Sequence, residues 1–264
     1  MNSSGNGRMI LNTYVVAVMV FLLLPIVIIV PLAFSSDASM AFPPSGFSLK
    51  WFEAALSRPE FLDAFYLSTR LAVVTTAISL SIGGLAAYAL VRFRFRGRAL
   101  CEALFLSPLI IPTVVIAIAL TMILGQMGLL RNFWGLVIAH TIMTLPYAVR
   151  VLAASLSEID RDVEEAALVL GATPARMLFH VLLPLLRPGI LAASIFALII
   201  SFDEFTVTLF VAGPGYYTLP IEIFNYVEFY SDPTIAAIST LLVALSCVAI
   251  AIIERIVGIR NVFK

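Results

Sequence analysis

Long apolar runs separated by short polar segments dominate the sequence. Six of these runs are long enough to cross about 30 Å of hydrocarbon as helices. They cover residues 14–34, 70–91, 103–124, 133–154, 188–212 and 235–254. Prolines inside several runs favour kinked helices, because neighbouring helices can cover the carbonyls that proline leaves unbonded. The pattern predicts an all-α membrane protein with six transmembrane helices, forming a single transmembrane domain over residues 1–264.

The composition supports a membrane location and excludes several soluble functions. Apolar side chains make up 61% of the 264 residues and charged ones 12%, and the mean hydropathy is +1.06. One soluble core does not enclose that much apolar surface. The formal net charge is zero, which leaves no basic surface for a nucleic acid. Cys101 and Cys247 stand far from other cysteines and from histidines, which favours packing roles over a metal site.

The basic residues indicate how the chain is oriented. With a cytoplasmic amino terminus, only Lys50, Arg58, Arg70 and Arg131 of the 16 lysines and arginines fall outside the cell. This asymmetry follows the positive-inside rule and predicts a bacterial inner-membrane protein with both termini in the cytoplasm. The first run also has features of a cleavable secretion signal, since Arg8 precedes it, but its length favours a retained anchor.

The most informative polar segment, residues 158–184, lies between the fourth and fifth runs. Acidic residues open a first short helix, where they suit the positive end of the helix dipole, and Gly171 is placed to end it. Thr173 is a suitable N-cap for a second helix, with Pro174 at its first position. The spacing of apolar residues makes this second helix amphipathic. The segment therefore predicts two short helices on the cytoplasmic face.

The first of these helices presents groups suited to a partner protein. Its small alanines would let another backbone approach, and Glu165 offers a carboxylate to an arginine. The segment resembles the E-A-A-x3-G-x9-I-x-L-P signature of ABC importer permeases. The matching residues are Glu165, Ala166, Ala167, Gly171, Leu183 and Pro184, with Val181 where isoleucine is usual. The resemblance implies a coupling loop that docks in a cleft of a cytoplasmic ATPase; the alternative is an amphipathic helix that lies on lipid headgroups.

The chain lacks the motifs of an enzyme. It has no G-x4-G-K-[ST] phosphate-binding loop, so we expect ATP and Mg²⁺ in a partner ATPase and no cofactor or metal in this chain. Ser201 and Asp203 are close in sequence, but no base completes a hydrolytic site, which disfavours an intramembrane protease. His140, inside the fourth run, is expected to form a hydrogen bond between helices rather than to bind a metal.

Acidic residues in the second half of the chain are candidates for a substrate pathway. Residues 188–254 contain no lysine or arginine, yet Asp203 and Glu204 lie within the fifth run and Glu222 follows it. Carboxylates at membrane depth are costly unless they face water, a partner or a cation. The pair therefore favours a cationic or zwitterionic amine as substrate, whereas the alternative is that these acids pair with a second subunit or cap a broken helix.

A second resemblance also favours an amine as substrate. The stretches Ser-Phe-Asp-Glu from 201, Gly-Pro-Gly-Tyr from 213 and Thr-Leu-Pro-Ile from 218 are similar to the second permease subunit of spermidine/putrescine-type transporters. This resemblance implies a second permease subunit, an ATPase dimer and a periplasmic binding protein as partners, and it leaves polyamines, gamma-aminobutyrate-like amino acids and opines open as substrates. An ion-coupled secondary transporter is the alternative function, in which the acidic pair would carry protons or sodium.

Aromatic residues gather in the external segments. Tyr216 and several other rings lie between the fifth and sixth runs, where they either form an interfacial belt or gate the pathway and contact ammonium groups. The longest external loop, residues 37–66, is expected to offer a docking surface to the binding protein.

Overall fold

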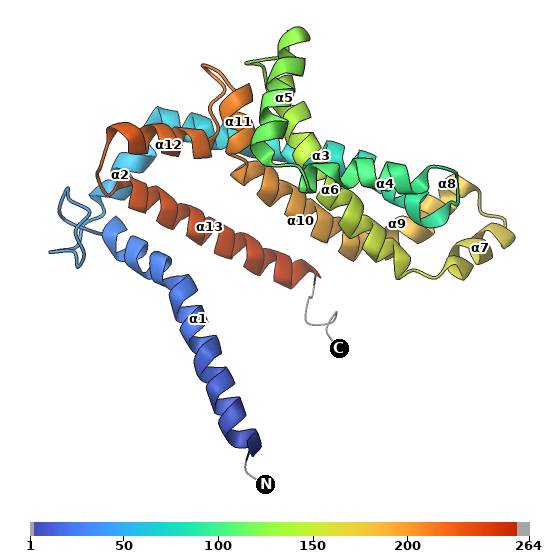
Figure 1. Cartoon of the computed structure of the whole chain (residues 1–264), viewed down its shortest axis with the longest axis horizontal. Coiled ribbons are helices and arrows are strands. Elements are labelled where there is room, and N and C mark those ends of the chain that lie inside the picture. Colours follow the sequence, from blue (N-terminus) through green and yellow to red (C-terminus); the bar gives the residue numbers. More distant parts are fainter. Residues whose placement is uncertain (1–2, 258–264) are drawn as a thin grey trace. The chain divides into compact units, whose positions relative to one another are not determined.

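The structure, a computed structural model, describes residues 3–257, and their regular secondary structure is helical. One isolated bridge joins Ser35 and Phe47. The elements are α1 Ser3–Ala33, α2 Lys50–Ser57, α3 Pro59–Arg92, α4 Arg98–Leu106, the 3-10 turn Ser107–Leu109, α5 Thr113–Gln126, α6 Phe133–Ser157, α7 Arg161–Val169, α8 Pro174–Met177, the π-helical turn Leu178–Leu182, α9 Leu183–Leu185, α10 Arg187–Asp203, α11 Thr206–Val211, α12 Leu219–Phe229 and α13 Thr234–Val257 (Figure 1). The predicted all-α class is confirmed.

The chain forms two compact units, Met1–Leu62 with Ile223–Lys264, and Asp63–Glu222. In the first unit, α13 packs against α1 and α2 through a small core that includes Leu32 and Ala236. Trp51 at the start of α2 donates its indole N–H to the carbonyl of Ser35, with Nε1 and O 2.8 Å apart. The assignment of residues 1–264 to a single domain stays a prediction.

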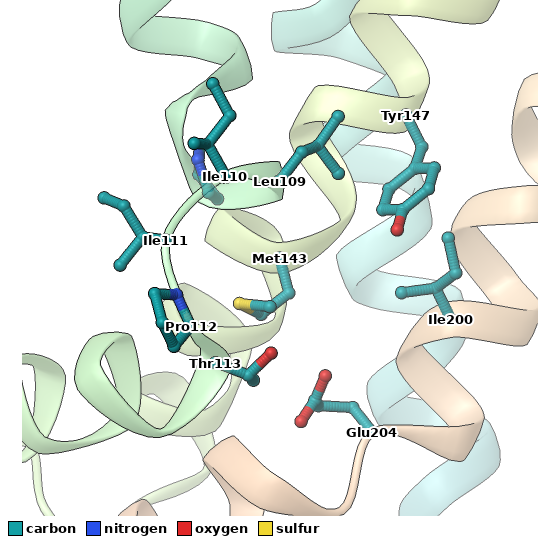
Figure 2. Close-up of a pocket in the computed structure, with 10 residues that line it drawn as sticks. Leu109, Ile110, Ile111, Pro112, Thr113, Met143, Tyr147, Ile200 and Glu204 are labelled. Carbon is teal, nitrogen blue, oxygen red and sulfur yellow. The ribbon is translucent and has the colours of Figure 1, made fainter.

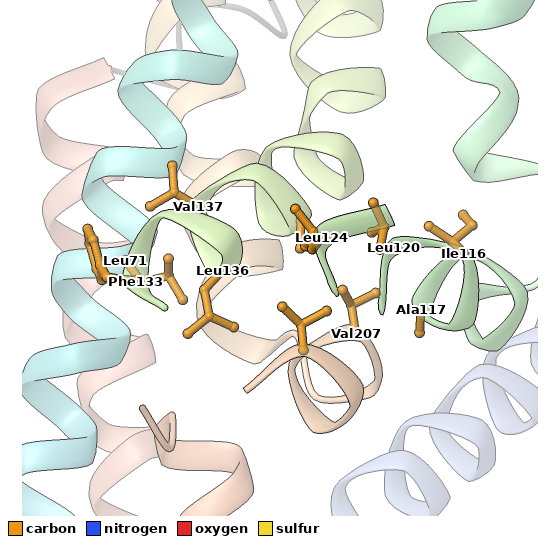
Figure 3. Close-up of a cluster of buried hydrophobic side chains, with 11 residues drawn as sticks. Leu71, Ile116, Ala117, Leu120, Leu124, Phe133, Leu136, Val137 and Val207 are labelled. Carbon is orange, nitrogen blue, oxygen red and sulfur yellow. The ribbon is translucent and has the colours of Figure 1, made fainter. Parts of the chain in front are cut away.

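The second unit is built on α6, which packs along α10 and also contacts α11 (Figure 1). Its largest core joins α3, α5, α6 and α11. Figure 3 shows side chains of this cluster, whose buried members are Leu71, Ile116, Ala117, Leu120, Leu124, Phe133, Leu136, Val137, Ala139, Val207 and Val211. Ala148 of α6 lies so close to Gly83 of α3 that a Cβ added to Gly83 would meet the alanine Cβ at 2.9 Å. Small residues of this kind let membrane helices approach closely.

Within the part of the chain that the structure describes, three helical segments are long and apolar enough to cross a membrane alone, Leu11–Ala33, Pro59–Arg92 and Phe133–Ser157. They correspond to the predicted spans 14–34, 70–91 and 133–154, the first of which extends one residue past its helix. Two further candidates are bent pairs of helices, and counting each pair as one span gives up to five. The predicted span 235–254 lies within α13, but only Thr234–Val248 of that helix could be tested for a span. The count of six therefore stays a prediction.

The two remaining predicted spans are not single helices. Within residues 103–124 the chain bends by 102° between Arg98–Leu109 and Thr113–Gln126, where Pro112 supplies no backbone N–H to continue the helix. Within residues 188–212, α10 ends at Asp203 and α11 begins at Thr206. The bend in the first of these runs agrees with the expected proline kinks, and the break in the second is the broken helix that the sequence left open as an alternative.

The external segment predicted as a loop over residues 37–66 also contains helices. It holds all of α2 and the first turns of α3, which begins at Pro59. Proline favours the first positions of a helix, because its missing N–H would have no partner there. The irregular part of this segment is therefore shorter than predicted.

Candidate functional site

The break between α10 and α11 is organised around Glu204. Its backbone leaves the helical region, with φ −68° and ψ 105°, which ends α10 after Asp203. The Glu204 carboxylate then accepts a hydrogen bond from the backbone N–H of Val207 at 2.9 Å, and its main-chain carbonyl accepts one from the Thr208 hydroxyl at 2.7 Å. These bonds satisfy groups that the helix break would leave unpaired inside a membrane. Glu204 is therefore a cap for α11, one of the roles that the sequence left open.

Glu204 also lines a cavity of about 360 Å³ in the second unit. The walls come from the turn between α4 and α5, from α6 and from α10. The lining residues are Pro108, Leu109, Ile110, Ile111, Pro112, Thr113, Met143, Tyr147, Ile200 and Glu204. Figure 2 shows the carboxylate of Glu204 directed toward Thr113, with Met143 above them and the ring of Tyr147 next to Ile200. Among these lining residues, Glu204 is the one that carries a charge. Most of the lining residues are apolar types, to which Glu204, Thr113 and Tyr147 add polar groups, and such a combination is typical of a small-molecule site.

The other candidate pathway residues lie away from this cavity. Asp203 is exposed at the end of α10 and is not among the lining residues. Glu222 is half-buried in the first turn of α12, and Tyr216 is half-buried against the core of α5, α6 and α11. The structure thus places Glu204 in the cavity wall and its neighbour Asp203 outside it.

An aromatic group in the first unit holds an arginine of the chain itself. The rings of Tyr226 and Tyr230 stack with centroids 4.7 Å apart, and the Arg58 guanidinium lies 4.8 Å and 5.1 Å from their centres. The Tyr226 hydroxyl donates to Asp232 at 2.7 Å. Burial alone would raise the pKa of Asp232, but hydrogen bonds from Thr234 and Tyr226 and the charge of Arg58 hold it below its ordinary value. These rings therefore already contact a cation, which supports a structural role over ammonium binding.

The predicted pair of short helices in residues 158–184 is present. Asp160 caps α7 by accepting from the N–H of Asp162 at 3.1 Å, and Gly171 follows the helix with φ +88°. Thr173 accepts from the N–H of Arg176 at 3.3 Å and so caps α8, which begins at Pro174. Left-handed backbone at the end of a helix favours glycine, because it has no Cβ to clash. Leu183 and Pro184 lie half-buried in α9.

Glu164 anchors α7 and was not predicted from the sequence. Its carboxylate oxygen lies 2.6 Å from Nε of Arg92, the last residue of α3, and each side chain is 8% exposed. The same guanidinium donates to the carbonyl of Ile159 at 2.9 Å, and Arg161 donates to the carbonyl of Arg92. One sequence signal existed: Glu164 stands three residues before half-buried Ala167, on the same face of the helix.

The remaining face of α7 is open. Glu165 and Ala166 are exposed, and Val169 and Leu170 at the end of the helix are each 87% exposed. An acidic residue beside two exposed apolar side chains suits contact with another protein. Glu165 and Ala166 of the signature therefore lie on an accessible surface, whereas Ala167 packs against the core that includes Leu156 and Met177.

The sequence matches a known family of transport proteins. Residues 79–260 match the family described as the binding-protein-dependent transport system inner membrane component. The chain belongs to this family. An EAA loop is typical of such permeases, and the assignment of residues 158–184 to it stays a prediction. Members of the family are permease subunits of ABC transporters and not enzymes themselves.

Similar proteins carry different substrate names. The spermidine/putrescine transport system permease protein PotC of Escherichia coli is 31% identical over 92% of each chain. The putrescine transport system permease protein PotI of the same species is 31% identical over 84% of this chain and 81% of its own length. The sulfoquinovosyl glycerol transport system permease protein SmoH of Agrobacterium fabrum is also 31% identical, over 89% of this chain and 86% of its own length. Identity alone does not decide among these substrates.

A solved structure has the same fold. It is a bacterial ABC transporter involved in the import of the acidic polysaccharide alginate, with a TM-score of 0.72, 18% identity and 98% coverage of both chains. The chain therefore shares its fold with this ABC transporter.

Proposed function

We propose that this permease imports a small polyamine-like cation through the cavity at Glu204. The carboxylate in the cavity wall is the observation that carries the proposal, since it adds one negative charge to a lining that is otherwise neutral. A carboxylate in a site of low dielectric attracts an ammonium group strongly and repels a sulfonate or another carboxylate.

Relatives with named substrates support a polyamine-like substrate only when they are considered together with the Glu204 cavity. The names of PotC and PotI refer to polyamines, while that of SmoH refers to a sulfonated glycoside at the same identity. The negative charge that Glu204 gives the cavity favours the polyamines over the sulfonated glycoside. Apolar walls suit the methylene chain of a diamine, and the hydroxyls of Thr113 and Tyr147 suit its second ammonium group.

Energy for transport comes, in this proposal, from a separate ATPase that docks on α7. Exposed Val169 and Leu170 supply an apolar contact, and Glu165 beside them supplies a carboxylate for a basic side chain. Closure of two ATPase subunits around ATP would move the loop of residues 158–184 and, through α10, open the cavity to the other side. The EAA loop typical of the family supports the assignment of transport to this permease and of ATP hydrolysis to a separate subunit.

The proposed assembly has a second permease subunit, two ATPases and a periplasmic binding protein, with both termini of this chain in the cytoplasm. The family description names a binding-protein-dependent system. The excess of basic residues in the segments assigned to the cytoplasm supports this orientation.

Uptake of labelled putrescine by the reconstituted importer tests the substrate. Glu204→Gln keeps the size and the acceptor for Val207 but removes the charge, and we expect a rise in KM of about 30-fold, from the loss of about 2 kcal/mol. Asp203→Asn, the adjacent acid outside the cavity, should change KM less than about twofold. Co-purification of the ATPase should be the same for both variants. Unchanged uptake by the Glu204 variant, or equal effects of both variants, would refute the assignment.

A further inference from the structure

His140 of α6 lies against the helix break with both ring nitrogens engaged. Its side chain is fully buried, at 0% exposed. Nδ1 lies 3.0 Å from the hydroxyl oxygen of Ser201 on α10, and Nε2 lies 2.9 Å from the hydroxyl oxygen of Thr208 on α11. Ser201 and Thr208 are themselves buried. One ring therefore connects the last turn of α10 to the first turn of α11, on either side of Glu204.

The hydrogen-bond directions can be assigned from the proton count. Thr208 has one hydroxyl proton, which it donates to the main-chain carbonyl of Glu204 at 2.7 Å. Its oxygen can then only accept from His140, so Nε2 carries the ring proton. In the neutral ring Nδ1 is an acceptor, and Ser201 donates to it. The bonds run from Ser201 to His140, from His140 to Thr208 and from Thr208 to Glu204.

This chain of bonds has a consequence for the cavity. Residues 204–205 have left the helix, so their direction is set by the two helix ends that flank them. The ring adds a link between α10 and α11 to the bonds that Val207 and Thr208 make to Glu204. A polar group in membrane without its partner is costly, which gives the histidine a strong preference for this arrangement.

We propose that His140 is a positioning residue for substrate transport, which holds the two helix ends so that the Glu204 carboxylate points into the cavity. The inference rests on the proposed role of Glu204. A purely structural role would lower the amount of folded protein but would not act through the carboxylate.

Transport kinetics separate these roles. In the reconstituted importer, His140→Leu should raise KM for putrescine about tenfold with kcat little changed, because the carboxylate is displaced rather than removed. In the Glu204→Gln background the same substitution should have almost no further effect on KM, since there is no charge left to position. An equal rise in KM in both backgrounds would overturn the proposal.

Two matched variants test the chemistry of the ring. His140→Gln retains a donor and an acceptor on one planar group and should recover part of the lost affinity; if it behaves as His140→Leu does, hydrogen bonding by the ring is not the cause. Ser79→Ala removes another buried bond to α6, the 2.6 Å contact with Thr144, and leaves both ring bonds of His140 in place. It should leave KM unchanged, and a rise equal to that of His140→Leu would overturn the proposal. If His140→Leu does not fold, Ser201→Ala and Thr208→Val each remove one of the two bonds.

A measurement without substrate distinguishes failure of this inference from failure of the proposed function. With Cys101 and Cys247 replaced by serine, a thiol introduced by Glu204→Cys reports its own accessibility to a methanethiosulfonate reagent. His140→Leu should change the modification rate several-fold, whereas Ser79→Ala should not. An unchanged rate would overturn the positioning role, even where putrescine uptake is normal. A changed rate in an importer that takes up no putrescine would leave His140 as a positioning residue and refute only the substrate.

Discussion

Replacing Glu164 tests whether α7 is held by its buried ion pair with Arg92. The two side chains are each 8% exposed, and their charged atoms are 2.6 Å apart. Removing one partner of a buried pair costs about 3–5 kcal/mol, because the remaining charge stays buried without compensation. Arg92 would keep its bond to the carbonyl of Ile159, so we take the lower end of this range for Glu164→Ala.

Hydrogen exchange of the α7 amides measures this effect directly. A loss of about 3 kcal/mol in the free energy of local opening corresponds to exchange that is about a hundredfold faster over residues 161–169. Glu164→Gln keeps an acceptor for Arg92 without the charge and should lose only about 1 kcal/mol. Glu165→Ala is the matched control: the neighbouring carboxylate is exposed, so exchange in the free permease should not change.

The outcome that refutes this reasoning is equal exchange of α7 in Glu164→Ala and Glu165→Ala. If the pair acts as described, the two variants also differ in the assembled importer. Loss of Glu164 loosens the connection between α7 and α3, so ATP hydrolysis should continue with less uptake per ATP. Loss of Glu165 should instead weaken binding of the ATPase, measured by titration of the two purified components.

Three further predictions concern local structure. Gly171→Ala should destabilise the end of α7 by about 1–2 kcal/mol, because the residue has φ +88°, whereas Gly171→Asn should cost less; α7 hydrogen exchange checks both. Gly83→Val should lower the thermal unfolding midpoint in detergent by forcing α3 away from Ala148, while Gly84→Ala, with 3.8 Å to its nearest neighbour, should be tolerated. The lowered pKa of Asp232 means that its stabilising bonds persist above the ordinary value of 3.8 and are lost as the pH falls through the lower folded-state value. An acid-induced change in the tyrosine near-ultraviolet circular dichroism should therefore be smaller in Asp232→Asn.

Features that depend on neighbouring residues in the sequence could be predicted. The turn at Gly171 and the cap at Thr173 follow from backbone preferences of those residue types, and the structure has both. The apolar runs predicted α1, α3 and α6 because their length and hydropathy are properties of the runs themselves. His140 was correctly expected to bond between helices, since a buried polar ring in a membrane needs a partner.

Features that depend on residues far apart in the sequence could not be predicted. Arg92 and Glu164 are separated by 72 positions, and no local sequence pattern around either residue indicates that the two form a pair. The cavity needs the bend before α5 as well as parts of α6 and α10, so no single motif encodes it. The break at Glu204 was only one of the alternatives that the sequence left open, because most of the surrounding run is apolar enough to continue a span and the bonds from Val207 and Thr208 to Glu204 are visible only in the fold.

ATP-driven uptake in proteoliposomes tests the proposed function most directly. The permease would be purified with the subunits that accompany it, reconstituted, and supplied with its binding protein, labelled putrescine and internal ATP. We expect saturable accumulation that requires ATP hydrolysis and that an excess of an anionic glycoside does not inhibit. Accumulation driven by a proton or sodium gradient without ATP would contradict the assignment as an ABC importer, and preferential uptake of the anionic glycoside would contradict the role of Glu204.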